Sequence, residues 1–141
     1  MKDIEIAKKY LEEENLCLAV VKDGRLIYKS YDKGIKPIYT LATEMADIGR
    51  ESSIADRVIG KGAAMLYKYI GVKEIYGKLL SDTAIETLEE SNIVYSYYKT
   101  CTYIKNWDGT DMCPIEKITV QVENTEELLD RIKDFLKATS K

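Results

Sequence analysis

The chain is organised around the segment Asp56-Arg57-Val58-Ile59-Gly60-Lys61-Gly62-Ala63-Ala64. Two glycines flank a lysine in it, and an apolar pattern with helical spacing follows directly. A glycine-rich turn that opens a helix exposes main-chain N–H groups and the positive end of the helix dipole, and both attract an anion. The same small residues would also let a central helix pack closely against a sheet. The sequence leaves both interpretations, anion binding and close packing, open.

Length and composition describe a single folded domain that spans residues 1–141. Hydrophobic residues make up 45% of the chain and charged residues 32%, which is typical of a globular protein with its own core. The formal net charge of -3 argues against a general nucleic-acid-binding protein, because such proteins need a strongly basic surface. No segment has the apolar length of a membrane span, and the N-terminal residues lack the apolar core of a signal peptide. We therefore expect a cytoplasmic protein with neither nucleic acid nor a membrane as its partner.

Histidine is absent from the sequence, which removes the commonest metal ligand and the commonest general base. The cysteines, Cys17, Cys101 and Cys113, are odd in number and far apart, so they match neither a disulfide framework nor a Cys-x-x-Cys pair. We expect no metal site and no cofactor. Eleven tyrosines stand against one phenylalanine, and we expect many of them to be half-buried with the hydroxyl group at the surface.

The first half of the chain is predicted to form helices around one hairpin. Asp3 matches the preference for the N-cap of an opening helix. Asp23-Gly24 between two apolar runs predicts a β-hairpin, and its first strand is apolar throughout, so we expect that strand at the centre of a sheet. The segment before Ser53 is predicted as a loop, and Ser53 or Asp56 as the cap of the buried helix that follows.

The second half alternates strands with helices. Strands are predicted over 73–80 and 93–98, with a helix capped by Ser81 between them. Pro114 matches the first turn of a further helix, and Asn124 matches the start of the last helix. Strands that alternate with helices form parallel pairs through crossovers, and the helices then cover both faces of the sheet. We therefore predict an α/β fold, a three-layer α/β/α domain with a mixed sheet.

Two motifs resemble a small prokaryotic family of unknown function with a cytidine deaminase-like fold: Val58-Ile59-Gly60-Lys61-Gly62-Ala63-Ala64 and Asp108-Gly109-Thr110-Asp111-Met112-Cys113-Pro114-Ile115-Glu116. The resemblance covers nearly the whole chain and implies that fold, with the N-terminus of the central helix in the site. True deaminases carry His-x-Glu or Cys-x-Glu there and Pro-Cys-x-x-Cys at the start of the next helix, and these residues hold zinc and move protons. Here the two places read Gly60-Lys61-Gly62 and Ser81-Asp82-Thr83-Ala84. Zinc-dependent deamination is therefore expected to be absent.

Cys113 is the candidate catalytic residue. A thiol near a helix N-terminus ionises more easily, and the thiolate is the nucleophile. Without histidine in the chain, however, this cysteine lacks the usual base partner. The alternative is a small buried side chain with no chemical role.

The candidate ligand-binding residues are Arg57, Gly60, Lys61, Gly62, Asp108, Thr110 and Asp111. Those of the glycine turn combine main-chain N–H groups with positive charge, which favours phosphate recognition. Those of the later loop are polar and can hydrogen-bond a sugar or an amide edge, but turn formation and helix capping also explain them. The two aspartates alone do not make a metal site.

These observations predict a zinc-free, deaminase-like domain that binds a small anionic ligand. A nucleotide or a nucleotide sugar is the favoured ligand. Two alternatives stay open at this point. One is an enzyme that uses Cys113 as its nucleophile. The other is a regulatory or scaffolding subunit without a small-molecule site, whose tyrosines form a protein interface. A homo-oligomer is compatible with all of them.

Overall fold

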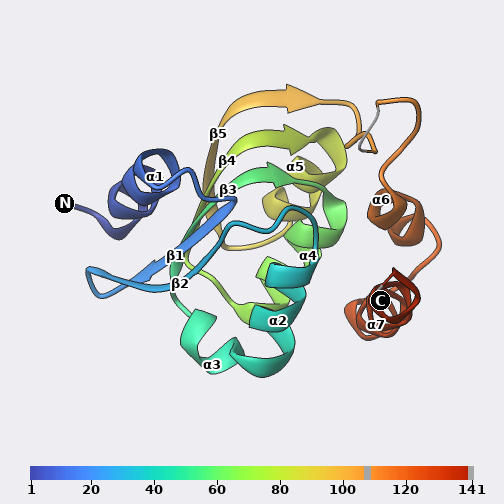
Figure 1. The fold of residues 1–141 in the computed structure, drawn as a ribbon, viewed down its shortest axis with the longest axis horizontal. Helices are drawn as coiled ribbons and strands as arrows, with labels where there is room; N and C mark the ends of the chain where they lie inside the picture. Colours follow the sequence, from blue (N-terminus) through green and yellow to red (C-terminus); the bar gives the residue numbers. More distant parts are fainter. Residues whose placement is uncertain (107–108, 140–141) are drawn as a thin grey trace.

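The computed structural model of the chain describes residues 1–106 and 109–139, which form a five-stranded sheet covered by helices (Figure 1). The strands are β1 (Leu18–Lys22), β2 (Arg25–Ser30), β3 (Ser53–Ile59), β4 (Glu74–Ser81) and β5 (Val94–Cys101). Their order across the sheet is β2-β1-β3-β4-β5. The hairpin β1–β2 and the pair β1–β3 are antiparallel, whereas β3, β4 and β5 run parallel. The predicted mixed sheet is therefore confirmed.

Helices pack on both faces of the sheet. They are α1 (Asp3–Glu13), α2 (Lys36–Glu44), α3 (Ala46–Gly49), α4 (Lys61–Ile70), α5 (Asp82–Glu89), α6 (Pro114–Thr119) and α7 (Thr125–Thr139). α1 covers one face, where Ala7 and Leu11 pack against Ala19 and Val21 of β1. α4 and α5 cover the other face (Figure 1), and α2 and α7 complete the larger core on that side. None of the described helices has the length and apolarity needed to cross a bilayer.

β3 is the central strand, and the expectation of a helix cap at Ser53 or Asp56 is wrong. The loop expected before Ser53 is present at residues 50–52. Asp56 and Arg57 interrupt the apolar pattern by which a buried strand is recognised. Tertiary contacts accommodate both side chains, since Asp56 bonds Tyr67 of α4 and Arg57 bonds the C-terminal end of α1. The residue that caps α4 is Gly60. β1, which was expected at the centre, lies beside β3 as an interior strand.

The ends of several elements follow the local signals. Asp23 and Gly24 have φ angles of 52° and 78°, as a tight hairpin turn requires. Asp3 is the first residue of α1 rather than its cap, and its carboxylate accepts the N–H groups of Asp23 and Gly24 at 3.0 and 2.9 Å. Further end signals are confirmed at Ser81, Pro114 and Asn124.

Candidate functional site

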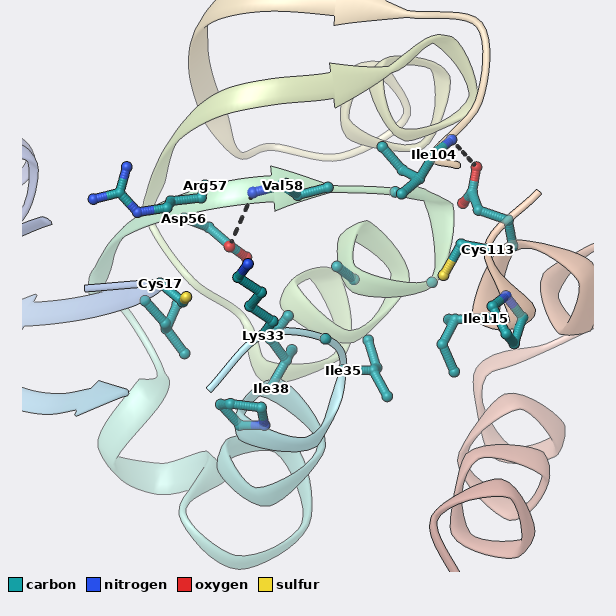
Figure 2. A pocket seen from close by; sticks show the side chains of 18 of the residues that line it. Cys17, Lys33, Ile35, Ile38, Asp56, Arg57, Val58, Ile104, Cys113 and Ile115 are labelled. Atoms are coloured by element: carbon teal, nitrogen blue, oxygen red, sulfur yellow. Dashed lines mark hydrogen bonds between the residues drawn. The ribbon is translucent and has the colours of Figure 1, made fainter. Parts of the chain in front are cut away.

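A cavity with a volume of about 660 Å³ lies where β3 ends and α4 begins. Its wall comes from five parts of the chain, within residues 17–18, 32–38, 56–63, 104–106 and 113–116 (Figure 2). Most of the lining is apolar, and a few polar groups converge on it. A concave, largely apolar space with a few placed polar groups is the usual form of a small-molecule site. This cavity is therefore the candidate functional site.

Asp56 brings a buried carboxyl group into the cavity wall, with only 6% of the residue exposed. Its Oδ2 accepts a hydrogen bond from the Tyr67 hydroxyl at 2.6 Å. Its Oδ1 accepts one from the Val58 N–H at 3.3 Å, which Figure 2 marks with a dashed line. Burial raises the pKa of Asp56 to about 7, because desolvation of the carboxylate outweighs these hydrogen bonds. Burial also raises the pKa of Tyr67 well above its ordinary value, and the neighbouring carboxyl group adds to this shift. Asp56 therefore changes between a hydrogen-bond donor and a pure acceptor near neutral pH.

Glu116 of α6 places a second buried carboxylate at the start of α4. Its Oε1 accepts the main-chain N–H of Lys61 at 3.0 Å. Its Oε2 accepts the N–H of Ile104 at 3.1 Å, which Figure 2 marks with a dashed line. The first N–H groups of a helix have no partner within the helix, and the helix dipole favours a negative charge there. A carboxylate of the chain itself thus lies where the sequence analysis leads us to expect a bound anion.

The two glycines of the turn leave room for α6. A Cβ atom at Gly60 would lie 2.5 Å from Oε1 of Glu116, and one at Gly62 would lie 2.8 Å from Cγ2 of Ile115. Gly60 has φ −96° and ψ −176°, a conformation open to any residue, so its requirement is steric. Of the two interpretations left open by the sequence, the geometry favours close packing around an internal carboxylate.

Arg57 lines part of the cavity, but its guanidinium group is engaged elsewhere. Nη2 donates to the main-chain oxygen of Leu11 at 3.0 Å and to Oδ1 of Asn15 at 3.2 Å, and Nε donates to the main-chain oxygen of Leu16. In Figure 2 the side chain extends away from the other labelled residues. Arg57 therefore ties the end of α1 to β3. Lys61, the other cation expected at the turn, contributes its main-chain N–H.

Thr110 and Asp111 lie in the loop before α6, outside the described cavity wall. Oδ1 of Asn106 accepts the Thr110 N–H at 3.1 Å, which closes a turn in this loop. Lys117 of α6 bonds the Asp111 carboxylate and lowers the pKa of Asp111. These contacts match turn formation and helix support, the structural explanation that the sequence analysis offers for them. Asp108, a further candidate ligand-binding residue, lies outside the described residues.

Cys113 is the N-cap of α6 and lines the same cavity as Gly60 and Gly62 (Figure 2). The thiol therefore lies beside the glycine turn. The chain returns to the turn because the Cys113 N–H donates to the main-chain oxygen of Ile104 at 2.8 Å. Among the described residues, no three histidine, cysteine, aspartate or glutamate side chains lie together as metal ligands would. The catalytic role of Cys113 stays a prediction.

The partnership between Asp56 and Tyr67 is the feature of the site that sequence reasoning misses. A carboxyl group between the apolar residues Ala55 and Val58 is the signal that points to it. The same aspartate also suits a helix cap, and that local interpretation hides the strand. Tyr67 belongs to the buried face of α4, so its pattern predicts packing only.

The family model that describes TM1506, a domain of unknown function (DUF1893), matches residues 6–136. The chain belongs to this family. A crystal structure of a DUF1893 family protein (TM1506) from Thermotoga maritima is similar to it, with a TM-score of 0.85 and 28% sequence identity over 95% of this chain and 90% of that one. No curated protein is significantly similar to the chain. The residues that line the cavity all lie within the range that the family model matches.

We predict that Glu116→Gln lowers the free energy of unfolding by about 1–3 kcal/mol, the usual loss when a buried polar group loses its partner. The amide offers one oxygen where the carboxylate now accepts two main-chain N–H groups with two oxygens. Urea unfolding of both proteins at neutral pH measures the difference. Glu90→Gln, at an exposed position, is the matched control and should change stability by no more than about 0.5 kcal/mol. A Glu116→Gln protein as stable as the wild type would contradict the capping role.

We predict that Asp56→Asn stabilises the protein at high pH. The folded protein holds the Asp56 proton with a pKa of about 7, against an ordinary value of 3.8, so the contribution of this group to stability is greatest below about pH 4. That contribution falls as the pH rises from about 4 to about 7, and at pH 8 the variant should be more stable by up to about 4 kcal/mol.

Urea unfolding of the wild type and Asp56→Asn across this pH range checks the prediction. The stability gain of the variant should shrink steadily towards low pH. Asp47→Asn, whose side chain is 98% exposed, is the control and should show no such trend. A difference between the wild type and Asp56→Asn that does not depend on pH would contradict the raised pKa.

Proposed function

We propose that this DUF1893 domain is a zinc-free, cytidine deaminase-like domain that binds a nucleotide or a nucleotide sugar in the cavity beside Asp56. The observation that carries the proposal is a buried carboxyl group in the wall of a largely apolar cavity. Apolar walls and a volume of about 660 Å³ suit a heterocyclic ring. The carboxyl group suits the N–H groups on the edge of such a ring. A titratable group with a strongly raised pKa in a cleft is also a general mark of functional sites.

The proposal places the anionic part of the ligand at the rim of the cavity rather than at the glycine turn. Glu116 already caps the first turn of α4, and a phosphate there would meet its negative charge. Lys33 and Lys105 are both exposed and both line the cavity, together with the carboxylate of Asp32. Lys105 lies in the segment that follows β5, and it is the cation to which we assign the phosphate group.

The deaminase-like part of the proposal rests on the motif resemblance and on the place of α4. In that fold the start of the central helix belongs to the site, and here Gly60 and Gly62 at the start of α4 line the cavity. We therefore assign ligand binding to this domain, without zinc-dependent deamination. The start of α5 supports this, because Ser81 caps the helix by accepting the Ala84 N–H at 3.1 Å and no cysteine pair is present in the sequence there.

Titration calorimetry with nucleosides, nucleotides and nucleotide sugars tests the proposal on protein that native mass spectrometry shows to be free of ligand. We expect nucleotides to bind and Asp56→Asn to weaken this binding by about 1–3 kcal/mol, the range for a hydrogen bond to a charged group. Lys105→Ala should weaken the binding of nucleotides more than that of nucleosides. Binding should strengthen as the pH rises through about 7, because the ionised Asp56 is the better acceptor.

The control is Asp47→Asn, since its exposed side chain lies outside the cavity wall. It should leave every affinity unchanged. Wild-type protein that binds none of these ligands at millimolar concentration would end the proposal. Equal affinities of wild type and Asp56→Asn would remove Asp56 from it.

A second candidate function is an enzyme with Cys113 as nucleophile, and the observation in its favour is that Cys113 lines the same cavity as Asp56. For a nucleophilic Cys113 we expect selective alkylation by a limiting amount of iodoacetamide, measured by intact mass and peptide mapping. Cys101 is the internal control, because burial raises the pKa of its thiol and it lies outside the described cavity wall. Labelling of Cys113 and Cys101 at equal rates would exclude an activated thiol.

A further inference from the structure

β5 is an edge strand whose surface plays no part in the proposed function. It is the last strand in the sheet order, and Figure 1 shows it at the upper margin of the fold. Its apolar and aromatic side chains are unusually exposed: Val94 by 60%, Tyr97 by 48% and Tyr98 by 70%. A row of such side chains along a sheet edge marks an interaction surface.

The main chain of β5 presents hydrogen-bonding groups on its outer side. The Val94 N–H donates towards β4, to the main-chain oxygen of Lys73. Because alternate residues of a strand direct their N–H and C=O groups to opposite sides, those of Tyr95, Tyr97 and Lys99 point away from β4. Such an outer row of donors and acceptors is a template for another strand.

The two edges of the sheet differ in how they resist pairing. The outer strand β2 carries Arg25 and Lys29, and the ladder between β1 and β2 contains an irregularity between Val20 and Val21. Charged side chains and bulges are the features by which natural sheets discourage edge-to-edge pairing. β5 contains no proline, and Lys99 is its single charged residue. The edge formed by β5 is therefore the one suited to association.

We infer that β5 pairs antiparallel with β5 of a second copy of this chain, with Tyr97 on the two-fold axis. Only antiparallel pairing of a strand with itself gives a closed dimer, and in a continuous sheet residues that face each other lie on the same face. This register places Lys99 of each copy opposite Tyr95 of the other.

Charge complementarity identifies the occupant as a second copy. The Tyr95 hydroxyl donates to the carboxylate of Glu89 within the same chain. In the dimer Lys99 of one copy therefore comes beside Glu89 of the other, and the symmetry repeats this opposite-charge contact on both sides of the axis. Tyr97 meets its own copy at the centre, and Tyr98 faces Ser96, so no like charges oppose each other along the paired strands.

Sedimentation equilibrium of the full chain over a range of concentrations tests this inference. We expect a monomer–dimer equilibrium for the wild type. Lys99→Glu should raise the dissociation constant by roughly tenfold, because it sets like charges side by side twice. The double variant Glu89→Lys with Lys99→Glu should restore the wild-type constant. Lys133→Glu, an exposed position on α7 with the same change in charge, is the control and should leave the constant unchanged.

Amide hydrogen exchange of the wild type provides a test that needs no variant. Raising the protein concentration should slow exchange at Tyr95, Tyr97 and Lys99, whose N–H groups become paired, while β2 residues exchange at unchanged rates. A wild type that is monomeric at every concentration would overturn the inference. A dimer that is indifferent to Lys99→Glu, or one whose protection lies on another element, would overturn it as well.

Discussion

The contact between the Glu116 carboxylate and the first turn of α4 is the constraint on which this end of the molecule depends. One side chain joins α6, the start of α4 and the segment that follows β5, because its two oxygens accept N–H groups from Lys61 and Ile104. The contact satisfies a main-chain donor that the helix itself leaves unpaired, and it places negative charge at the positive end of the helix dipole. It also favours glycine at position 60, because a Cβ atom there would lie 2.5 Å from Oε1 and the carboxylate would have to move.

The same contact shapes the cavity. Ile104, Cys113 and Glu116 form one part of its wall, and they reach the glycine turn only because the loop after β5 is held against α4. The opposite part of the wall comes from the residues that precede and begin α2. The cavity is therefore a product of two loops that approach the end of a central strand, the place where open α/β sheets commonly bind their ligands.

Asp56 is a different kind of constraint, since it lowers stability rather than adding to it. A carboxyl group in the middle of β3 loses its hydration, and the bonds from Tyr67 and Val58 compensate only in part. A valine or threonine at this buried position would fit the strand at a lower cost in folding free energy. A costly polar group that faces a cavity is the pattern expected where binding, rather than packing, determines the residue. β5 shows a comparable conflict at the surface, because Tyr97 and Tyr98 leave much of their aromatic surface exposed.

Local chemistry accounts for what the sequence by itself determined. Asp23-Gly24 predicts its hairpin and Ser81 its helix cap, because each forms hydrogen bonds or backbone angles within a few residues. The alternation in the second half predicts β4, α5 and β5 for the same reason, and the mixed α/β sheet follows from that order. At the site, the sequence correctly places Cys113 at the start of a helix, because Pro114 matches its first turn.

Only the tertiary structure decided the role of the polar residues that lie far apart in the chain. The sequence pattern does not predict β3, because Asp56 and Arg57 have their hydrogen-bond partners in α4 and α1, which no local pattern reveals. The sequence leaves the glycine turn open between an external anion and close packing, because Glu116, which accepts the Lys61 N–H, lies more than fifty residues away in sequence. A pattern of residue types records which groups need a partner, whereas the packing of distant segments determines which partner they receive.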